Sequence, residues 1–120
     1  MTKILIAEDD QFLANAYRVK FEKEGFEVLI AMDGEEAISS LETFTPDLII
    51  LDLVMPKKDG FVTLSEIKAN PKYAAIPVIV TSNLSQTTDF DKAKELGAVE
   101  YLVKSETPIG EIVNKINNYL

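Results

Sequence analysis

Short apolar segments of strand length alternate along this chain with segments whose apolar residues recur at helical spacing. The apolar segments are mostly continuous runs of aliphatic residues, which is typical of strands buried on both faces of a parallel sheet. We predict strands at residues 3–7, 26–31, 47–51, 77–82 and 99–103. We predict helices at residues 11–25, 34–44, 60–69 and 87–97, and a last helix with Thr107 as N-cap and Pro108 at its first position. The alternation indicates an α/β fold with a doubly wound, five-stranded parallel sheet and five helices.

Composition narrows the classes of function. The 120 residues fit one domain, and we expect residues 1–120 to form it. No apolar run is long enough to span a membrane, and no signal peptide begins the chain, so we expect a cytoplasmic protein. The absence of His and Cys means that any metal ion should be a hard cation bound by oxygen. A net charge of -8 argues against binding to nucleic acid or to an anionic membrane, and it favours protein partners.

Acidic residues follow two of the predicted strands. Glu8 and Asp9 come directly after the first strand, and Asp52 ends the third. If the strand order is 2-1-3-4-5, these strands are neighbours and the acids share one crevice at the carboxyl edge of the sheet. Carboxylates crowded in this way repel one another unless a cation lies among them, and Mg²⁺ suits such a site. A structural interpretation stays open, with Asp10 as a helix N-cap and Asp52 as a turn former.

Two more polar side chains follow the remaining strands of the expected edge. Ser82 closes the fourth strand with a hydroxyl group, and Lys104 follows the fifth with an ammonium group. A metal ion and a lysine can neutralise a phosphoryl group, a hydroxyl can bind its oxygen, and a carboxylate can act as the nucleophile. The combination therefore indicates a site for phosphoryl transfer.

The sequence resembles the response-regulator receiver domains of two-component signalling over its whole length. The resemblance is carried by four stretches, "ILIAEDD", "LDLVMPKKDG", "PVIVTS" and "GAVEYLVKS", and by the intervals between them. It implies a flavodoxin-like fold and phosphorylation of an aspartate by a histidine kinase or a histidine phosphotransfer protein. It also implies a stand-alone receiver that is a monomer when unphosphorylated, signals to a downstream protein target, and catalyses only its own phosphorylation and dephosphorylation.

The resemblance assigns a role to each residue of the site. Asp52 is expected to be the phosphoacceptor. Asp9, Asp52 and the carbonyl of Val54 are expected to bind Mg²⁺ directly, and Glu8 through water. Ser82 would be the switch hydroxyl, Lys104 the lysine that contacts the phosphoryl group, and Tyr101 the switch aromatic. On phosphorylation, Ser82 and Tyr101 should move, and the face of the fourth helix, fifth strand and fifth helix should change shape.

Four positions depart from the commonest pattern of the family. Glu8 replaces Asp, and Ser82 replaces Thr. Asn83 stands where Ala or Gly is usual, and Ser105 where Pro is usual, often after a cis bond. A cis bond before Ser costs roughly 3 kcal/mol more than a trans bond, so the sequence leaves the conformation of the Lys104–Ser105 loop open.

Apolar residues occupy two positions that tune hydrolysis in the family. Val54 lies two residues beyond the phosphoacceptor and Leu84 two beyond the switch hydroxyl, and neither can hold a water by hydrogen bonds. Asn83 adds bulk beside them, although its amide is able to orient a water. We predict slow loss of the phosphoryl group.

The first helix carries more apolar residues than the core requires. Leu13, Tyr17 and Phe21 suffice to cover the sheet, yet three further residues extend the apolar arc to roughly 220°. These are Phe12, Ala16 and Val19. The helix is either buried over a broad arc or offers a docking face for the kinase or phosphotransfer protein.

Two other functions share features with this sequence. A Mg²⁺-dependent nucleic-acid enzyme of the topoisomerase–primase type also has acids after two strands, but it requires Asp-x-Asp where this chain has Asp52-Leu53-Val54. A receiver that binds partners without being phosphorylated is the second alternative, and it would keep Mg²⁺ binding. The cognate kinase and the target are not readable from the sequence.

Overall fold

The computed structural model describes residues 1–120 as a five-stranded parallel sheet in the order β2-β1-β3-β4-β5, with helices on both faces. The predicted fold class and strand order are confirmed. The strands are β1 (Lys3–Ala7), β2 (Glu27–Ala31), β3 (Leu48–Leu51), β4 (Val78–Ser82) and β5 (Glu100–Val103). The helices are α1 (Gln11–Lys23), α2 (Gly34–Ser40), α3 (Gly60–Ala69), α4 (Thr87–Glu95) and α5 (Ile109–Asn117), with a short 3₁₀ helix η1 at Lys104–Glu106.

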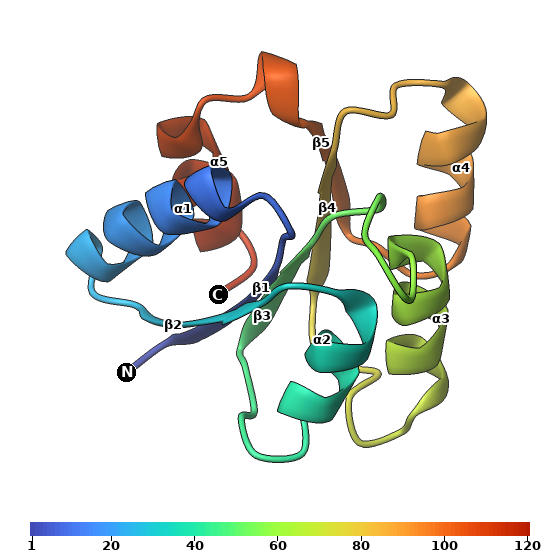
Figure 1. Cartoon of the computed structure of the whole chain (residues 1–120), viewed down its shortest axis with the longest axis horizontal. Coiled ribbons are helices and arrows are strands. Elements are labelled where there is room, and N and C mark those ends of the chain that lie inside the picture. Colours follow the sequence, from blue (N-terminus) through green and yellow to red (C-terminus); the bar gives the residue numbers. More distant parts are fainter.

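Each face of the sheet has its own hydrophobic core, because successive side chains of a strand point to opposite faces. Figure 1 shows α1 and α5 on one face and α2, α3 and α4 on the other. In β1, Ile4 and Ile6 belong to the cluster that contains Tyr17 of α1, whereas Leu5 belongs to the cluster that contains Leu64 of α3. Burial on both faces explains why the central strands read as unbroken apolar runs.

The end of one helix differs from the prediction by more than fraying. The helix predicted to reach residue 44 ends at Ser40, where the hydroxyls of Ser39 and Ser40 both donate to the carbonyl of Glu36. Such side-chain bonds compete with the helical ladder and favour a helix end. Leu41 is nevertheless buried, as the apolar pattern predicted.

The predicted N-cap of the last helix is wrong by one residue. Pro108 is the N-cap and Ile109 begins the helix. The hydroxyl of Thr107 instead donates to the carbonyl of Val103 at 2.9 Å, which closes the short η1 helix. Ile112 and Val113 are buried as predicted, and Ile109 is only half-buried.

The loop after β3 is packed against the N-terminus of α3. The Gly60 N–H donates to the carbonyl of Leu53 at 2.8 Å, and a Cβ at Gly60 would collide with the backbone of Asp52. Asp59 caps α3 by accepting from the Val62 N–H at 3.0 Å. This packing holds Asp52 at a fixed place on the carboxyl edge of the sheet. No helix of the chain has the length and apolar character needed to cross a membrane.

Candidate functional site

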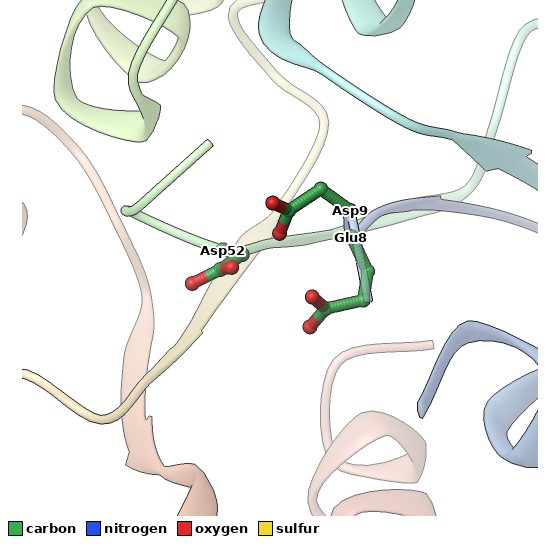
Figure 2. A group of neighbouring side chains, drawn as sticks. All are labelled: Glu8, Asp9 and Asp52. Carbon is green, nitrogen blue, oxygen red and sulfur yellow. The ribbon is translucent and has the colours of Figure 1, made fainter. Parts of the chain in front are cut away.

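Three carboxylates lie at the carboxyl ends of β1 and β3. These strands are neighbours in the sheet, with Ala7 opposite Leu51, so the residues that follow them come side by side. One oxygen from each of Glu8, Asp9 and Asp52 lies within 4.8 Å of the others. Figure 2 shows the three side chains gathered at this edge. Glu8 and Asp52 are buried, at 1% and 4% exposure, whereas Asp9 is exposed.

Asp10 has a structural role. Its side chain accepts hydrogen bonds from the N–H groups of Phe12 at 3.0 Å and Leu13 at 3.2 Å, so it is the N-cap of α1. The structural interpretation of the acidic run therefore holds for its last member. Glu8 and Asp9 make no such cap, and they face Asp52 instead.

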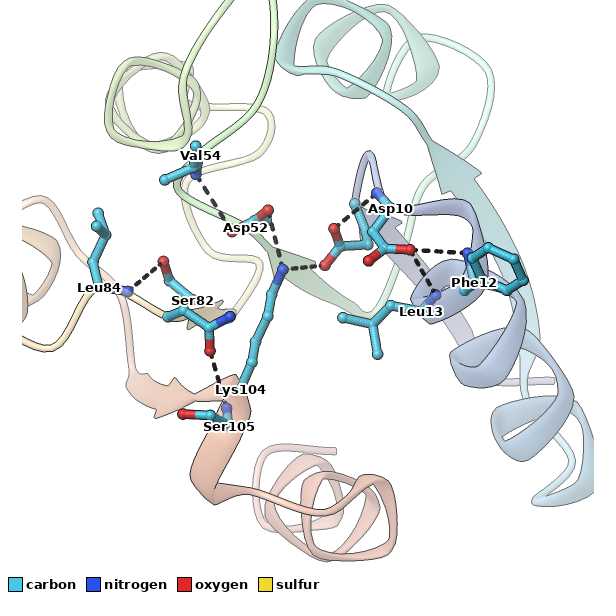
Figure 3. Close-up of polar contacts among 11 residues, drawn as sticks. Asp10, Phe12, Leu13, Asp52, Val54, Ser82, Leu84, Lys104 and Ser105 are labelled. Carbon is cyan, nitrogen blue, oxygen red and sulfur yellow. Dashed lines mark hydrogen bonds and ion pairs between the residues drawn. The ribbon is translucent and has the colours of Figure 1, made fainter.

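Lys104 joins the two buried acids. Its Nζ pairs with Glu8 Oε1 and lies 3.1 Å from Asp52 Oδ2 (Figure 3). Burial works to lower the pKa of Lys104, but the bonds with Glu8 and Asp52 outweigh it and raise that pKa. The site thus brings one ammonium against three carboxylates, which leaves an excess of negative charge.

Burial governs the acidity of the two acids themselves. Burial raises the pKa of Asp52, and the nearby charge of Lys104 opposes that rise without cancelling it. The pKa of Glu8 is raised for the same reason, again against the bond from Lys104. A buried carboxylate with its charge only partly neutralised has a high affinity for a further cation.

The donor set suits a hard divalent cation. Carboxylate oxygens are the preferred ligands of Mg²⁺, and the exposed Asp9 gives a side that is open to metal-bound water. The N–H of Val54 donates to Asp52 Oδ1 at 3.3 Å, so the backbone of Val54 lies beside the same carboxylate. Mg²⁺ therefore fits the residues present.

Ser82 ends β4, the neighbour of β3, with its side chain buried. Its Oγ accepts from the Leu84 N–H at 3.2 Å, and the hydroxyl of Tyr101 donates to the Leu84 carbonyl at 2.7 Å. The ring of Tyr101 packs edge-on against Phe90, with the centroids 4.5 Å apart. Tyr101 on β5 is thereby linked through one backbone residue to Ser82.

The structure defines the conformation of the loop after Lys104, which the sequence leaves open. All peptide bonds are trans, including the one between Lys104 and Ser105. The Ser105 N–H donates to Asn83 Oδ1 at 3.0 Å, so two of the four residues that depart from the family pattern contact each other (Figure 3). Nothing in the sequence alone places Asn83 beside Ser105. The signal that pairs them is chemical, because Asn adds an acceptor at one position and Ser adds an N–H donor at the other.

The three residues assigned to water access have different surroundings. Val54 is 60% exposed. Leu84 is half-buried and packs against the core cluster on the α2–α4 face. Asn83 is exposed, and its carbonyl oxygen accepts a hydrogen bond from the Ser105 N–H.

The surface of α1 departs from a broadly buried helix. Tyr17 and Phe21 are buried and their rings stack at 5.8 Å, so they cover the sheet as predicted. Phe12 is 91% exposed and Val19 is 58% exposed, while Ala16 is half-buried. Burial in the monomer therefore does not explain the wide apolar arc of this helix.

The chain matches the response regulator receiver domain over residues 4–117. It therefore belongs to this family, the class of two-component signalling domains that the site and fold define, and the resemblance drawn from the sequence is confirmed.

Individual relatives agree with this membership. The chain is 39% identical over 120 residues to the protein-glutamate methylesterase/protein-glutamine glutaminase 3 of Rhodospirillum rubrum, covering 97% of this chain and 31% of that protein. The Francisella response regulator 1452 receiver domain superposes with a TM-score of 0.91 at 31% identity, covering 99% of this chain and 96% of that one. The Mn²⁺-bound form of response regulator Rcp1 gives a TM-score of 0.88 at 31% identity, with coverages of 99% and 94%.

The curated relatives are longer proteins. The chain spans less than half of the length of those that it matches, from 31% to 43%. Their matching region is a receiver domain, and the remainder of each has no counterpart in these 120 residues.

Proposed function

We propose that this receiver domain accepts a phosphoryl group on Asp52 from a histidine kinase or a histidine phosphotransfer protein, with Mg²⁺ bound by Asp9, Asp52 and the Val54 carbonyl. The observation that carries the proposal is the buried Asp52 carboxylate, paired with Lys104 and adjacent to Glu8 and Asp9. Glu8 shares these neighbours, but no acid outside this cluster has both an ammonium partner and two further carboxylates beside it.

Asp52 and the residues around it have different roles in phosphoryl transfer. A carboxylate oxygen of Asp52 attacks phosphorus, forming a new P–O bond while the bond to the donor nitrogen breaks and the donor imidazole leaves. Mg²⁺, when bound, supplies positive charge for the transferring oxygens. Lys104 supplies a second positive charge. The rigid end of β3 holds the attacking carboxylate of Asp52 in place. The Ser82 hydroxyl is left to donate to a phosphoryl oxygen once it turns away from Leu84.

The signal leaves through a change of the face formed by α4, β5 and α5. Ser82 moves toward the phosphoryl oxygen and gives up its bond with the Leu84 N–H. Leu84 is then held less firmly, and so is the Tyr101 hydroxyl that donates to its carbonyl. Beside Tyr101, a groove of about 350 Å³ between α4 and β5 is lined by Phe90, Lys94 and Val99 among others. A shift of Tyr101 changes this groove, which suits recognition by a downstream protein.

The donor protein docks on α1. Phe12 and Val19 expose apolar surface on α1, and Phe12 lies in the first turn of this helix, which begins two residues after Asp9. A histidine-bearing helix bundle that packs on this surface would bring its phosphohistidine to Asp52. We propose that residues 1–120 act as one receiver domain, monomeric before phosphorylation, with no nucleic-acid or membrane ligand and no catalysis beyond its own phosphorylation and dephosphorylation.

A test with a small phosphodonor requires no knowledge of the cognate kinase. The protein is incubated with acetyl phosphate and Mg²⁺, and intact mass spectrometry should show one added phosphoryl group that is absent when EDTA is present. Absence of the adduct in Mg²⁺ would contradict the proposal.

The metal assignment is tested separately by titration calorimetry with Mg²⁺. Asp9→Ala should bind Mg²⁺ at least tenfold more weakly, since it loses a direct charged ligand. Glu42→Ala, which removes an exposed acid outside the site, is the matched control and should bind as the parent does. Equal affinity of Asp9→Ala and the parent would show that the assignment is wrong.

A further inference from the structure

Two loops at the carboxyl edge of the sheet are joined by one side-chain hydrogen bond. Asn83 lies in the loop after β4, directly after Ser82, and Ser105 lies in η1, directly after Lys104. The Ser105 N–H donates to Asn83 Oδ1 at 3.0 Å, across 22 residues of sequence. The bond therefore joins the residue next to the proposed switch hydroxyl to the residue next to the proposed phosphoryl-binding lysine.

We propose that Asn83 is a positioning residue, which holds Lys104 between Glu8 and Asp52 by fixing the backbone of Ser105. This inference rests on the proposed function only for the roles of Ser82 and Lys104. The contact itself is independent of phosphorylation.

The geometry of η1 explains why this segment needs a side-chain bond. The helix has only three residues, and its closing Thr107 N–H to Lys104 carbonyl contact is long at 3.4 Å. The Thr107 hydroxyl holds the start of the segment through the Val103 carbonyl at 2.9 Å. Asn83 holds its middle, at the residue that follows Lys104. Lys104 reaches Glu8 and Asp52 over a flexible four-carbon stem, so movement of its backbone adds to the freedom that these two ion pairs must restrain.

The chemistry of the pair is specific. A Pro at position 105 has no N–H, and an Ala or Gly at position 83 has no side-chain acceptor, so neither of the usual family residues can make this bond. Asn83 and Ser105 thus form a functional pair. Their bond restrains the loop after Lys104, where the usual family residue is a proline at position 105.

The bond also determines what Asn83 is able to do to water. The bond from the Ser105 N–H uses one of the two lone pairs of its carbonyl oxygen, and both of its N–H donors remain free. An attacking water must keep a lone pair for phosphorus and is best oriented by a group that accepts its proton. The bond to Ser105 therefore leaves Asn83 with one acceptor site, instead of two, for such a water.

The first arm of the test examines the bond in the Mg²⁺-free, unphosphorylated protein. Asn83→Ala and Asn83→Leu both lack an acceptor but differ in volume. Hydrogen exchange of the Ser105 amide should become roughly fivefold faster in both, as expected for loss of one net hydrogen bond. The amide order parameter of Lys104 should fall below the value of about 0.85 that is typical of rigid backbone. Unchanged exchange at Ser105, or an unchanged Lys104 order parameter, would overturn the proposal.

The second arm measures phosphorylation by acetyl phosphate. At saturating donor and Mg²⁺, both variants should react several-fold more slowly, while the Mg²⁺ dissociation constant stays that of the parent. A role limited to general stability would change both quantities or neither. Ser105→Ala keeps the N–H donor and should react at the parent rate, and the double variant Asn83→Ala with Ser105→Ala should lose no more than Asn83→Ala alone. A loss in Ser105→Ala, or a further loss in the double variant, would contradict coupling through this bond.

The two arms separate the two hypotheses. If the parent itself is not phosphorylated, the proposed function fails, and the Ser105 and Lys104 amides still decide whether Asn83 positions the lysine loop. If the parent is phosphorylated and the variants react at the parent rate, Asn83 is not a positioning residue.

Discussion

At the scale of single residues, Asp52 combines a reactive group with an unfavourable environment. Its carboxylate is 4% exposed, and burial raises its pKa although Lys104 is bonded to it. Glu8 is in the same condition, so two buried acids compete for one ammonium. This surplus of negative charge is what a divalent cation relieves, and it explains in physical terms why the site should bind metal before it accepts a phosphoryl group.

The first prediction concerns stability without metal. A carboxyl group whose pKa is raised by folding contributes stability below its unfolded pKa of about 4, and this contribution is lost as the pH rises through the folded pKa. The raised pKa means that folding disfavours the ionised form of Asp52, so Asp52→Asn, which carries no charge, should raise the free energy of unfolding at pH 7. The gain should narrow toward zero near pH 4, where the parent carboxyl is protonated as well.

Urea unfolding in EDTA at both pH values measures this difference. Asp91→Asn is the control, because it removes an exposed acid outside the site, and it should change stability little at either pH. A less stable Asp52→Asn variant at pH 7 would mean that Lys104 more than compensates the buried charge.

The second prediction concerns the lifetime of the phosphorylated form. Val54 is exposed at the site and Leu84 is half-buried behind it, and neither side chain can orient a water. Val54→Asn and Leu84→Glu introduce groups that can, so the decay of labelled protein should quicken by about tenfold in at least one of them. Val62→Asn, at an exposed position of α3, is the control. Parent-like decay in both site variants would show that these positions do not control water access.

At the scale of elements, α1 serves the core with one face and exposes apolar side chains on another. Phe12→Ala and Val19→Ala should raise the KM for a phosphotransfer protein that phosphorylates the parent by about tenfold, the effect of a modest interface hot spot. The rate with acetyl phosphate should not change, because neither residue touches Asp52. Val62→Ala provides a control for loss of an exposed aliphatic side chain. Equal losses with both donors would place the defect in the site and not in docking.

The elements α4, β5 and α5 carry the fourth prediction. The chain of contacts from Ser82 through Leu84 to Tyr101 predicts that phosphorylation shifts amide resonances along these elements. Such a shift is a change of population between two states and reflects the contacts that differ between them. Tyr101→Phe removes the hydroxyl that bonds Leu84 and should weaken the response on β5. Shifts confined to the loop after Asp52 would contradict this route.

Across the whole molecule, the sheet was predictable because its signal is distributed. Each central strand is a continuous apolar run, and burial on both faces requires such runs whatever the details of the loops. Apolar runs alone do not determine the strand order, which was therefore a condition of the sequence-based prediction. Once β1 lies beside β3, the meeting of the three acids follows. The end of α2 was not predictable from apolar spacing, because the Ser39 and Ser40 hydroxyls that favour its end leave that spacing unchanged.

Two further features, the exposure of Phe12 and the bond between Asn83 and Ser105, depend on how segments distant in sequence are placed in space. The sequence could not show whether Phe12 is exposed or buried, since phenylalanine occurs both in cores and on docking surfaces. The bond between Asn83 and Ser105 needs two loops to approach each other, and no local pattern encodes that distance. The sequence showed only that Asn83 offers an acceptor and that Ser105 has an N–H donor.

The central claim is that Asp52 is the acceptor, and the most direct measurement is the location of the phosphoryl group. The protein is phosphorylated with acetyl phosphate and Mg²⁺, the acyl phosphate is trapped by borohydride reduction, and the reduced residue is located by peptide mass spectrometry. The parent should carry the reduced product at Asp52 alone, and Asp52→Asn, which keeps the shape of the side chain, should carry none. Full labelling of the Asn variant at another residue, or a parent adduct that maps to Asp9 or Glu8, would contradict the account.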